Sequence, residues 1–198
     1  RIVLGGRSLD GVPPHRRRVV LMSQAAQLFP HLGVRDNVAF GPRSLGHGRR
    51  AARALADHWL EVVGMSAFAD RRPGGLSGGQ AAQVALVRAL AARPTILILD
   101  EPLAAIDVES ASKWRRFLRA TRRDRTTLLV THNALDIAGL ADDMVVMNSG
   151  RVTAHGPAAD LLDVPPTGFV ANIAGLNRVE GTVSEATAAE TVVTCGNT

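Results

Sequence analysis

The feature that most constrains the fold is the run Thr-Ile-Leu-Ile-Leu-Asp at 95–100, which is apolar without alternation and ends in a carboxylate. A strand with this pattern is buried on both faces, as is typical of a parallel sheet. The stretch 126–132, Thr-Thr-Leu-Leu-Val-Thr-His, has the same character. We therefore expect two buried strands in one parallel sheet.

Helical patterns alternate with these strands. Apolar residues recur at helical spacing over 49–63, and Gly64 supplies a stop. Asn133 is a suitable cap for a short helix at 133–143. The other predicted elements are helices at 34–40, about 78–92 and 108–122, and short strands at 1–6 and 17–23. The alternation predicts an α/β layered domain around a parallel sheet.

The pattern changes towards the end of the chain. Residues 144–156 read as a hairpin, with its turn around Asn148, and residues 158–163 as a short helix. Pro165 and Pro166 then interrupt the chain, and 178–195 reads as two strands. We expect one domain over 1–165, and a linker with the beginning of a small β-module over 166–198.

Composition excludes several classes of protein. The 198 residues are 46% hydrophobic, enough for a core, and no apolar run reaches the roughly 18 residues of a membrane span. The net charge of +5 rests on scattered arginines, because Lys113 is the only lysine. With 4% aromatics and no tyrosine, the chain has no platform for stacking bases, so we expect no nucleic-acid partner. A single cysteine, Cys195, excludes an internal disulfide and fits a reducing compartment.

Three polar side chains follow the two buried strands. Asp100 and Glu101 stand at the carboxyl end of the first strand, where α/β sheets bind ligands. One carboxylate there can hold Mg²⁺, and the other can orient water or take a proton from it. His132 ends the second strand and can bond a terminal phosphate. Two solvated acids in a turn and an ordinary edge histidine are the alternative interpretations.

A glycine-rich segment opens the helix predicted to end near residue 92. Ser77, Gly78 and Gly79 precede its apolar face. Glycines let backbone N–H groups approach an anion closely, the serine adds a hydroxyl donor, and the helix dipole favours negative charge. The alternative is a simple serine cap with a flexible lead-in.

Taken in order, these motifs resemble those of the ATP-binding cassette ATPases. The matching segments are Leu-Ser-Gly-Gly-Gln at 76–80, Ile-Leu-Ile-Leu-Asp-Glu-Pro at 96–102, Ala-Ala-Ile-Asp at 104–107 and Val-Thr-His at 130–132. Residues 22–41 look like the glutamine loop of the family, with Gln24 as its glutamine. The resemblance covers about residues 1–165. It implies a P-loop NTPase-like α/β domain with a helical subdomain at about 34–92.

The resemblance also implies roles for individual residues, with ATP and Mg²⁺ as cofactors. Asp100 would help to bind Mg²⁺, and Glu101 would be the general base or would orient the water. Gln24 would contact the metal and the water, and His132 would contact the γ-phosphate. Asp107 would lie in the loop that connects two copies. The residues that would grip the ATP of the opposite subunit are Ser77, Gly78, Gly79 and Gln80.

The implied partners are a second ATPase subunit, integral membrane permease subunits and a periplasmic or surface-anchored substrate-binding protein. The implied location is peripheral, at the cytoplasmic face of the plasma membrane. Residues 28–41 look like importer ATPases for sulfate, molybdate and polyamines. Residues 169–183 resemble the junction where molybdate importer ATPases pass into a β-barrel oxyanion-binding module. We therefore expect an oxyanion importer, molybdate first, with sulfate, iron or polyamine as alternatives.

Some features depart from the family. The phosphate loop, Gly-x-x-x-x-Gly-Lys-Ser/Thr, does not occur in the 198 residues, and Lys113 follows the carboxylates instead of preceding them. We expect an N-terminally truncated chain that binds ATP weakly and does not turn it over alone. Ala81-Ala82-Gln83 and the Ala-Ala-Ile-Asp loop also differ from the usual residues, which affects the dimer interface.

Two further hypotheses remain. One is a non-catalytic remnant that keeps the dimer face. The other is a nucleic-acid-associated cassette ATPase, which the compact stretch between Gln24 and Leu76 disfavours because it has no large insertion or basic-aromatic patch.

Overall fold

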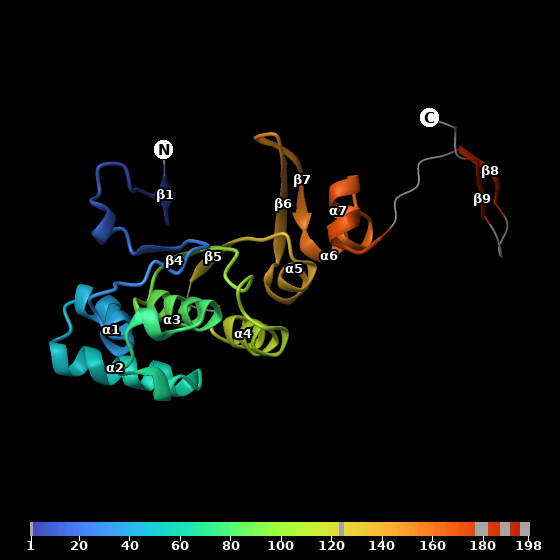
Figure 1. Ribbon diagram of the computed structural model, residues 1–198. Helices are drawn as coiled ribbons and strands as arrows, with labels where there is room; N and C mark the ends of the chain where they lie inside the picture. The colour runs from blue at the N-terminus through green and yellow to red at the C-terminus, as the bar shows by residue number, and fades with distance from the viewer. Residues whose placement is uncertain (1, 123–124, 177–181, 187–190, 195–198) are drawn as a thin grey trace. The chain divides into compact units, whose positions relative to one another are not determined.

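The computed structural model describes residues 2–122, 125–176, 182–186 and 191–194 (Figure 1). The chain forms two compact units, Arg1–Thr131 and His132–Thr198. The domain boundary expected near residue 165 stays a prediction. In the part of the chain that the structure describes, no helix combines the length and the apolar character needed to cross a membrane.

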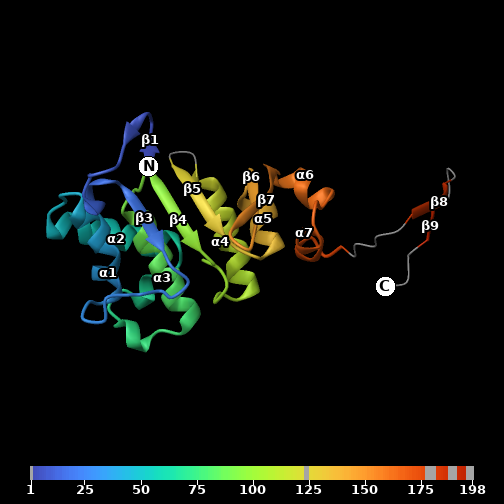
Figure 2. The ribbon, with the colours of Figure 1, turned by 90° about the horizontal axis from the view of Figure 1, so that it is seen from above.

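A parallel sheet of three strands organises the first unit. Its order is β3 (Val19–Met22), β4 (Ile96–Asp100) and β5 (Thr126–Val130). Val19 aligns with Ile96, which aligns in turn with Thr126. Figure 2 shows the three strands side by side. The parallel sheet is as predicted, and its carboxyl ends share one edge.

The sheet is buried on one face only. Helices α3 (Gly78–Ala91) and α4 (Val108–Ala120) lie on one side of the sheet (Figure 1). Leu97 and Leu99, which share one face of β4, are almost fully buried. On the opposite face Leu21, Leu128 and Val130 are 62%, 56% and 50% exposed. The expectation that both strands are buried on both faces is wrong in this structure, because no described element of this unit covers the second face.

Three helices pack together below the sheet: α1 (Val34–Ser44), α2 (Arg49–Val62) and α3. Their contacts bury a core of Val34, Val38, Leu60, Val84, Leu86, Val87 and Leu90. Gly41 of α1 lies against the end of α3, because a Cβ atom there would be 2.8 Å from the backbone nitrogen of Ala92. The absence of a side chain at Gly41 therefore permits the two helices to approach closely.

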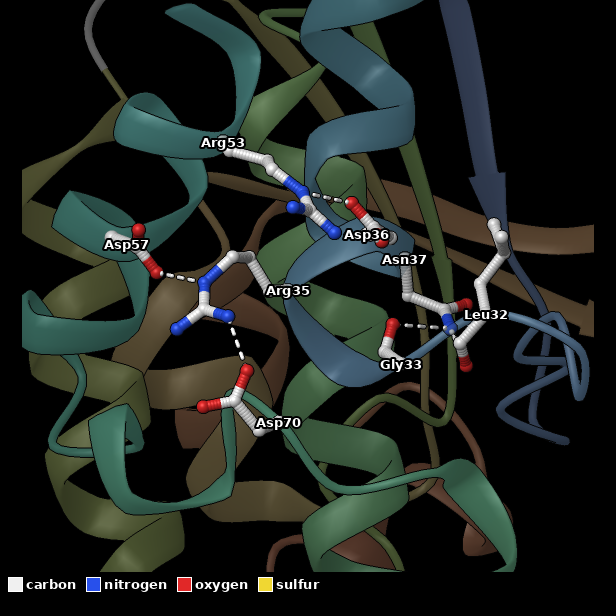
Figure 3. A network of polar contacts seen from close by, with 8 residues as sticks. All are labelled: Leu32, Gly33, Arg35, Asp36, Asn37, Arg53, Asp57 and Asp70. Carbon is white, nitrogen blue, oxygen red and sulfur yellow. Dashed lines mark hydrogen bonds and ion pairs between the residues drawn. The ribbon is translucent and has the colours of Figure 1, made fainter. Parts of the chain in front are cut away.

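Ion pairs fasten α1 to its neighbours (Figure 3). Arg53 of α2 holds both carboxylate oxygens of Asp36, at 2.7 and 2.6 Å. Arg35 donates to Asp57 and to Asp70. The hydrogen bond from Arg53 lowers the pKa of Asp36, so this carboxylate stays ionised. The pairs are partly exposed, so each contributes little to stability but fixes the register of the helices.

Turns and caps in the first unit follow local sequence. Strands β1 (Val3–Leu4) and β2 (Arg7–Ser8) pair through Gly5 and Gly6, whose φ angles of +54° and +78° suit a two-residue hairpin turn. Helix α2 ends before Gly64, which has a φ of +73°, as its sequence predicts. The short 3₁₀ helices are Pro14–Arg16, Ser66–Phe68 and Pro73–Gly75.

The second unit begins with α5 (Ala134–Leu140), which Asn133 caps by accepting from the N–H groups of Leu135 and Asp136. Strands β6 (Asp143–Asn148) and β7 (Arg151–Pro157) form the predicted hairpin, and Ser149 and Gly150 turn it with positive φ. The remaining elements are α6 (Ala158–Asp163), α7 (Gly168–Ile173), β8 (Thr182–Ala186) and β9 (Thr191–Thr194).

Helix α7 lies within the span expected to be a linker. Thr167 caps it by accepting from the N–H of Val170. Strands β8 and β9 pair antiparallel, and they agree with the two strands predicted over 178–195.

The close approach at Gly41 gives a stability prediction. Gly41→Ala places a methyl group against the backbone of Ala92, so α1 or α3 must shift. We expect a loss of roughly 1–3 kcal/mol in the free energy of unfolding, typical of overpacking. Urea denaturation of the protein expressed from its natural gene measures it.

Gly74→Ala is the matched control, because a Cβ atom there meets nothing within 4 Å. Its effect should stay within about 0.5 kcal/mol. Equal urea midpoints for the two variants would show that α1 and α3 can shift to accept the methyl group without loss of stability.

Candidate functional site

The carboxyl end of β4 holds two acidic side chains in a fixed backbone. Asp100 is the last residue of the strand, and Glu101 follows with a φ of +48°. Left-handed backbone at a residue other than glycine is uncommon and is often found at functional sites. The N–H of Glu101 donates to the carbonyl of Val130 at 2.9 Å, and the Thr131 hydroxyl donates to its carboxylate at 3.4 Å. The end of β5 therefore holds both the backbone and the side chain of Glu101.

Gln24 belongs to the same edge of the sheet. It is exposed and lies two residues beyond β3, whose last residue, Met22, aligns with Leu99 of β4. The parallel register thus brings Gln24, Asp100 and Glu101 to one edge, where α/β folds bind ligands. His132 directly follows Thr131 in the chain and is the first residue of the second unit.

Ser77 is the N-cap of α3 and takes part in a capping box. Its hydroxyl accepts from the N–H of Gln80 at 3.2 Å, and the Gln80 side chain accepts from the N–H of Ser77 at 2.9 Å. The simple cap considered from the sequence is therefore present. A hydroxyl that accepts one bond keeps its own proton to donate, so capping and anion binding are compatible at Ser77.

The start of α3 lies against the loop 104–107. A Cβ atom on Gly79 would be 2.8 Å from the carbonyl oxygen of Ala105, so only glycine fits there. A Cβ atom on Gly78 would meet nothing within 4 Å. Asp107 ends the loop as the N-cap of α4 and accepts from the N–H of Ser110 at 2.9 Å. That hydrogen bond lowers the pKa of Asp107. Two motifs that are about 27 residues apart in the sequence thus meet in the structure.

The meeting point is a hollow of about 510 Å³. Its lining combines hydroxyl, amide and carboxylate groups with backbone and with apolar side chains. The lining residues are Ser77, Gly79, Gln80, Gln83, Asp107 and Ser110, together with Gly64, Met65, Phe68 and Ala105.

Arg88, on α3, was not among the residues predicted from the sequence. It donates to the carbonyls of Gln27 at 3.0 Å and Ala26 at 3.2 Å, and its guanidinium carbon is 5.1 Å from the centre of the Phe29 ring. Burial lowers the pKa of Arg88. A single cation in the apolar run Val-Ala-Leu-Val-Arg-Ala-Leu was the signal, because a buried charge needs partners.

Asn37, on α1, was also missed. Its side chain is fully buried, accepts from the N–H of Phe29 at 2.8 Å, and donates to the carbonyl of Phe29. It also donates to the carbonyls of Leu32 and Gly33 (Figure 3). Residues 23–33, called the β3–α1 loop below, are therefore held from two helices. The signal was a polar residue beside Val38 on the apolar face of a helix.

The carboxylates fit a metal that arrives with a phosphate ligand. Among the described residues, no group of three or more His, Cys, Asp or Glu side chains could hold a metal ion. Mg²⁺ is commonly bound by one or two carboxylates together with phosphate oxygens. Asp100 and Glu101 can supply that number of carboxylates at the sheet edge.

Comparisons with known proteins show the family to which the chain is related. A family model described as "ABC transporter" matches residues 1–104. A molybdenum import ATP-binding protein of Mycobacterium tuberculosis is 48% identical over 178 residues, covering 87% of this chain and 48% of that protein. A spermidine/putrescine import ATP-binding protein of Frankia alni is 44% identical, covering 90% and 39%. An Fe(3+) ions import ATP-binding protein of Streptomyces avermitilis is 42% identical, covering 96% and 56%.

The chain thus spans about half the length of the curated relatives it matches. Among solved structures, an ATP-binding cassette, described as a dimer in a post-hydrolysis state bound to ADP and Pi, superposes with a TM-score of 0.70. It is 24% identical and covers 78% of this chain and 72% of its own. This likeness confirms the predicted α/β fold class.

The environment of Asn37 gives a prediction with a pH dependence. Asn37→Asp replaces an amide donor with a carboxylate oxygen that faces the carbonyls of Phe29, Leu32 and Gly33. Burial among carbonyls raises the pKa of that new carboxyl above its unfolded value. The stability lost to the charge is therefore small below about pH 4 and grows as pH rises towards the folded pKa. We expect a cost of roughly 3–5 kcal/mol at pH 7.

Urea denaturation of the variant and the wild type at pH 4.5 and pH 7 measures the difference between their free energies of unfolding. Each extrapolated free energy carries an uncertainty of about 10–15%. Asn172→Asp is the control, because Asn172 is exposed on α7. A cost for Asn37→Asp that does not change with pH would contradict a buried carboxylate at this position.

Proposed function

Because the chain belongs to the ABC transporter family, we propose that it is part of the ATP-binding and ATP-hydrolysing subunit of an importer. The observation that carries the proposal is the contact of Gly79 with Ala105, which joins the Ser77–Gln80 segment to the loop of Asp107. The carboxylates at the edge of the sheet support it. Relatives that are 42–48% identical carry the names of import ATP-binding proteins.

In this proposal the sheet edge performs the hydrolysis. Asp100 holds the metal, and Glu101 orients the attacking water or takes its proton. The left-handed backbone of Glu101 and its bond from Thr131 hold the carboxylate in one place. Gln24 contacts the metal and the water, and His132 contacts the terminal phosphate. When bound, Mg²⁺-ATP supplies the phosphoryl group and the charge neutralisation that its transfer requires.

The hollow at the start of α3 serves a second copy. Ser77, Gly78, Gly79 and Gln80 donate to the phosphate end of a nucleotide held by the opposite subunit. Asp107 lies at the border of the two copies. The pattern of the phosphate loop does not occur in the 198 residues, so we assign to this stretch the contacts named here and not the phosphate cradle.

The proposed partners are a second ATPase subunit, membrane permease subunits and a substrate-binding protein. The proposed location is peripheral, at the cytoplasmic face of the plasma membrane. Uptake of an oxyanion, molybdate first, is supported by the 48% identity to a molybdenum import protein. Relatives named for spermidine/putrescine and for Fe(3+) follow at 44% and 42%, and these substrates are the alternatives.

Glu101 provides the test of hydrolysis. The protein is expressed from its natural gene together with its permease, and ATP hydrolysis is measured in membrane vesicles. We expect Glu101→Gln to lower kcat by roughly 10²–10⁴-fold, because the amide cannot take a proton. Nucleotide binding, measured by filter retention, should persist in this variant.

The control is Glu109→Gln, because Glu109 is exposed on α4 and its carboxylate pairs with Lys113 of the same helix. It should retain wild-type hydrolysis, since an exposed pair contributes about 0–1 kcal/mol. Equal rates for the wild type and Glu101→Gln would remove Glu101 from the mechanism. A wild-type complex without hydrolysis would favour the non-catalytic remnant.

The transported substrate is tested separately. Cells that lack the gene should lose high-affinity molybdate uptake at submicromolar concentration, and the wild-type gene should restore it while the Glu101→Gln gene should not. Uptake of sulfate, Fe(3+) and spermidine is measured in the same strains. Loss of spermidine or iron uptake with molybdate uptake intact would replace the oxyanion with that substrate.

A further inference from the structure

The β3–α1 loop is gripped near its middle by a single side chain. The two terminal nitrogens of Arg88 donate to the successive carbonyls of Ala26 and Gln27, at 3.2 and 3.0 Å. The same guanidinium stacks over the Phe29 ring at 5.1 Å. One planar group thus fixes two peptide units and a ring in the segment that follows Gln24.

The segment it grips is strained. Gln27 has a φ of +41°, in the left-handed region that residues other than glycine rarely adopt. Such a conformation persists where its surroundings hold it. The carbonyl of Gln27 is one of the two acceptors of Arg88, so the arginine bonds directly to the strained peptide. The turn that sets the path of the chain after Gln24 therefore depends on Arg88.

The helix that carries Arg88 also carries the Ser77–Gln80 segment. Helix α3 runs without interruption from its cap at Ser77 to Ala91. Arg88 lies eleven residues after Ser77, about 16 Å along the axis. Asn37 holds the same loop from α1, at Phe29, Leu32 and Gly33. Arg88 is thus the side chain through which α3 itself holds the loop of Gln24.

We propose that Arg88 is a positioning residue, which holds Gln24 at its metal and water contact and ties that position to α3. The inference rests on the proposed function, in which Gln24 makes that contact. The planar fork of arginine suits two neighbouring carbonyls, whereas the ammonium group of lysine offers a point charge. Lysine at this position keeps the charge but gives up the second bond.

The first arm of the test measures the loop without any cofactor. Hydrogen exchange is followed by mass spectrometry in the wild type and in Arg88→Met, with the protein expressed from its natural gene. We expect the peptide 24–29 to exchange roughly tenfold faster or more in the variant at the amide of Phe29, because this amide donates to Asn37 only while the loop stays closed, and Arg88 holds the loop through two carbonyls. Residues 82–87 of α3 should keep their protection. Arg50→Met, on the exposed face of α2, should change neither.

The second arm measures the Mg²⁺ requirement of ATP hydrolysis in the complete complex. The Mg²⁺ concentration for half-maximal rate should rise about tenfold in Arg88→Met, as for loss of a group that orients a metal ligand. Arg88→Lys should show a smaller rise. A lower fraction of folded protein reduces the rate at every Mg²⁺ concentration and leaves the half-maximal concentration unchanged. Adding Arg88→Met to Gln24→Ala should cause no further rise.

Three results would overturn the inference. Exchange at 24–29 could equal that of the wild type, α3 could lose protection together with the loop, or the loop could open with no change in the Mg²⁺ requirement. If Arg88→Met does not fold, Arg88→Lys gives the same comparison. Absence of hydrolysis in the wild type would overturn the proposed function and the role of Gln24, while the exchange data would still decide whether Arg88 holds the loop.

Discussion

The site depends on the register of three short parallel strands. Because Met22 aligns with Leu99, and Asp100 with Val130, strands β3, β4 and β5 end at nearly the same level. The residues that follow those ends are the polar ones of the site. A slip of one residue in β4 would turn its buried leucines to the other face and carry the carboxylates out of line. Burial of Leu97 and Leu99 therefore fixes where these polar side chains lie.

Two polar side chains, the fully buried Asn37 and the half-buried Arg88, bond to carbonyls of the β3–α1 loop. The β3–α1 loop passes beside the core, where unpaired carbonyls are costly. Asn37 and Arg88 meet this need from α1 and α3. Both sit on helices that are otherwise apolar on the same side, so the two polar groups stabilise one path of the loop over others. Packing in the helical layer and the position of Gln24 are thereby linked.

Local sequence patterns predicted most helices and strands. They did not predict contacts between residues that are distant in the sequence. Gly64 and Asn133 act as stop and cap as predicted, because those choices depend on a few neighbouring residues. The burial of both faces of β4 and β5 was wrong, because apolar composition does not tell which element covers a face. Helix α7 has only six residues, too few for a periodic signal. The bonds of Arg88 join residues 61 and 62 positions apart, which no local pattern encodes.

Gly78 and Gly79, at the start of α3, differ in what would meet a side chain at each position. Gly79 is required by the carbonyl of Ala105, whereas a side chain on Gly78 would extend into open space. The capping box uses the N–H groups of Ser77 and Gln80. Helix geometry leaves the N–H groups of Gly78 and Gly79 without intrahelical acceptors, at the positive end of the dipole. Packing accounts for one glycine only. In the function proposed above, Gly78 would give the phosphate of a nucleotide access to the backbone.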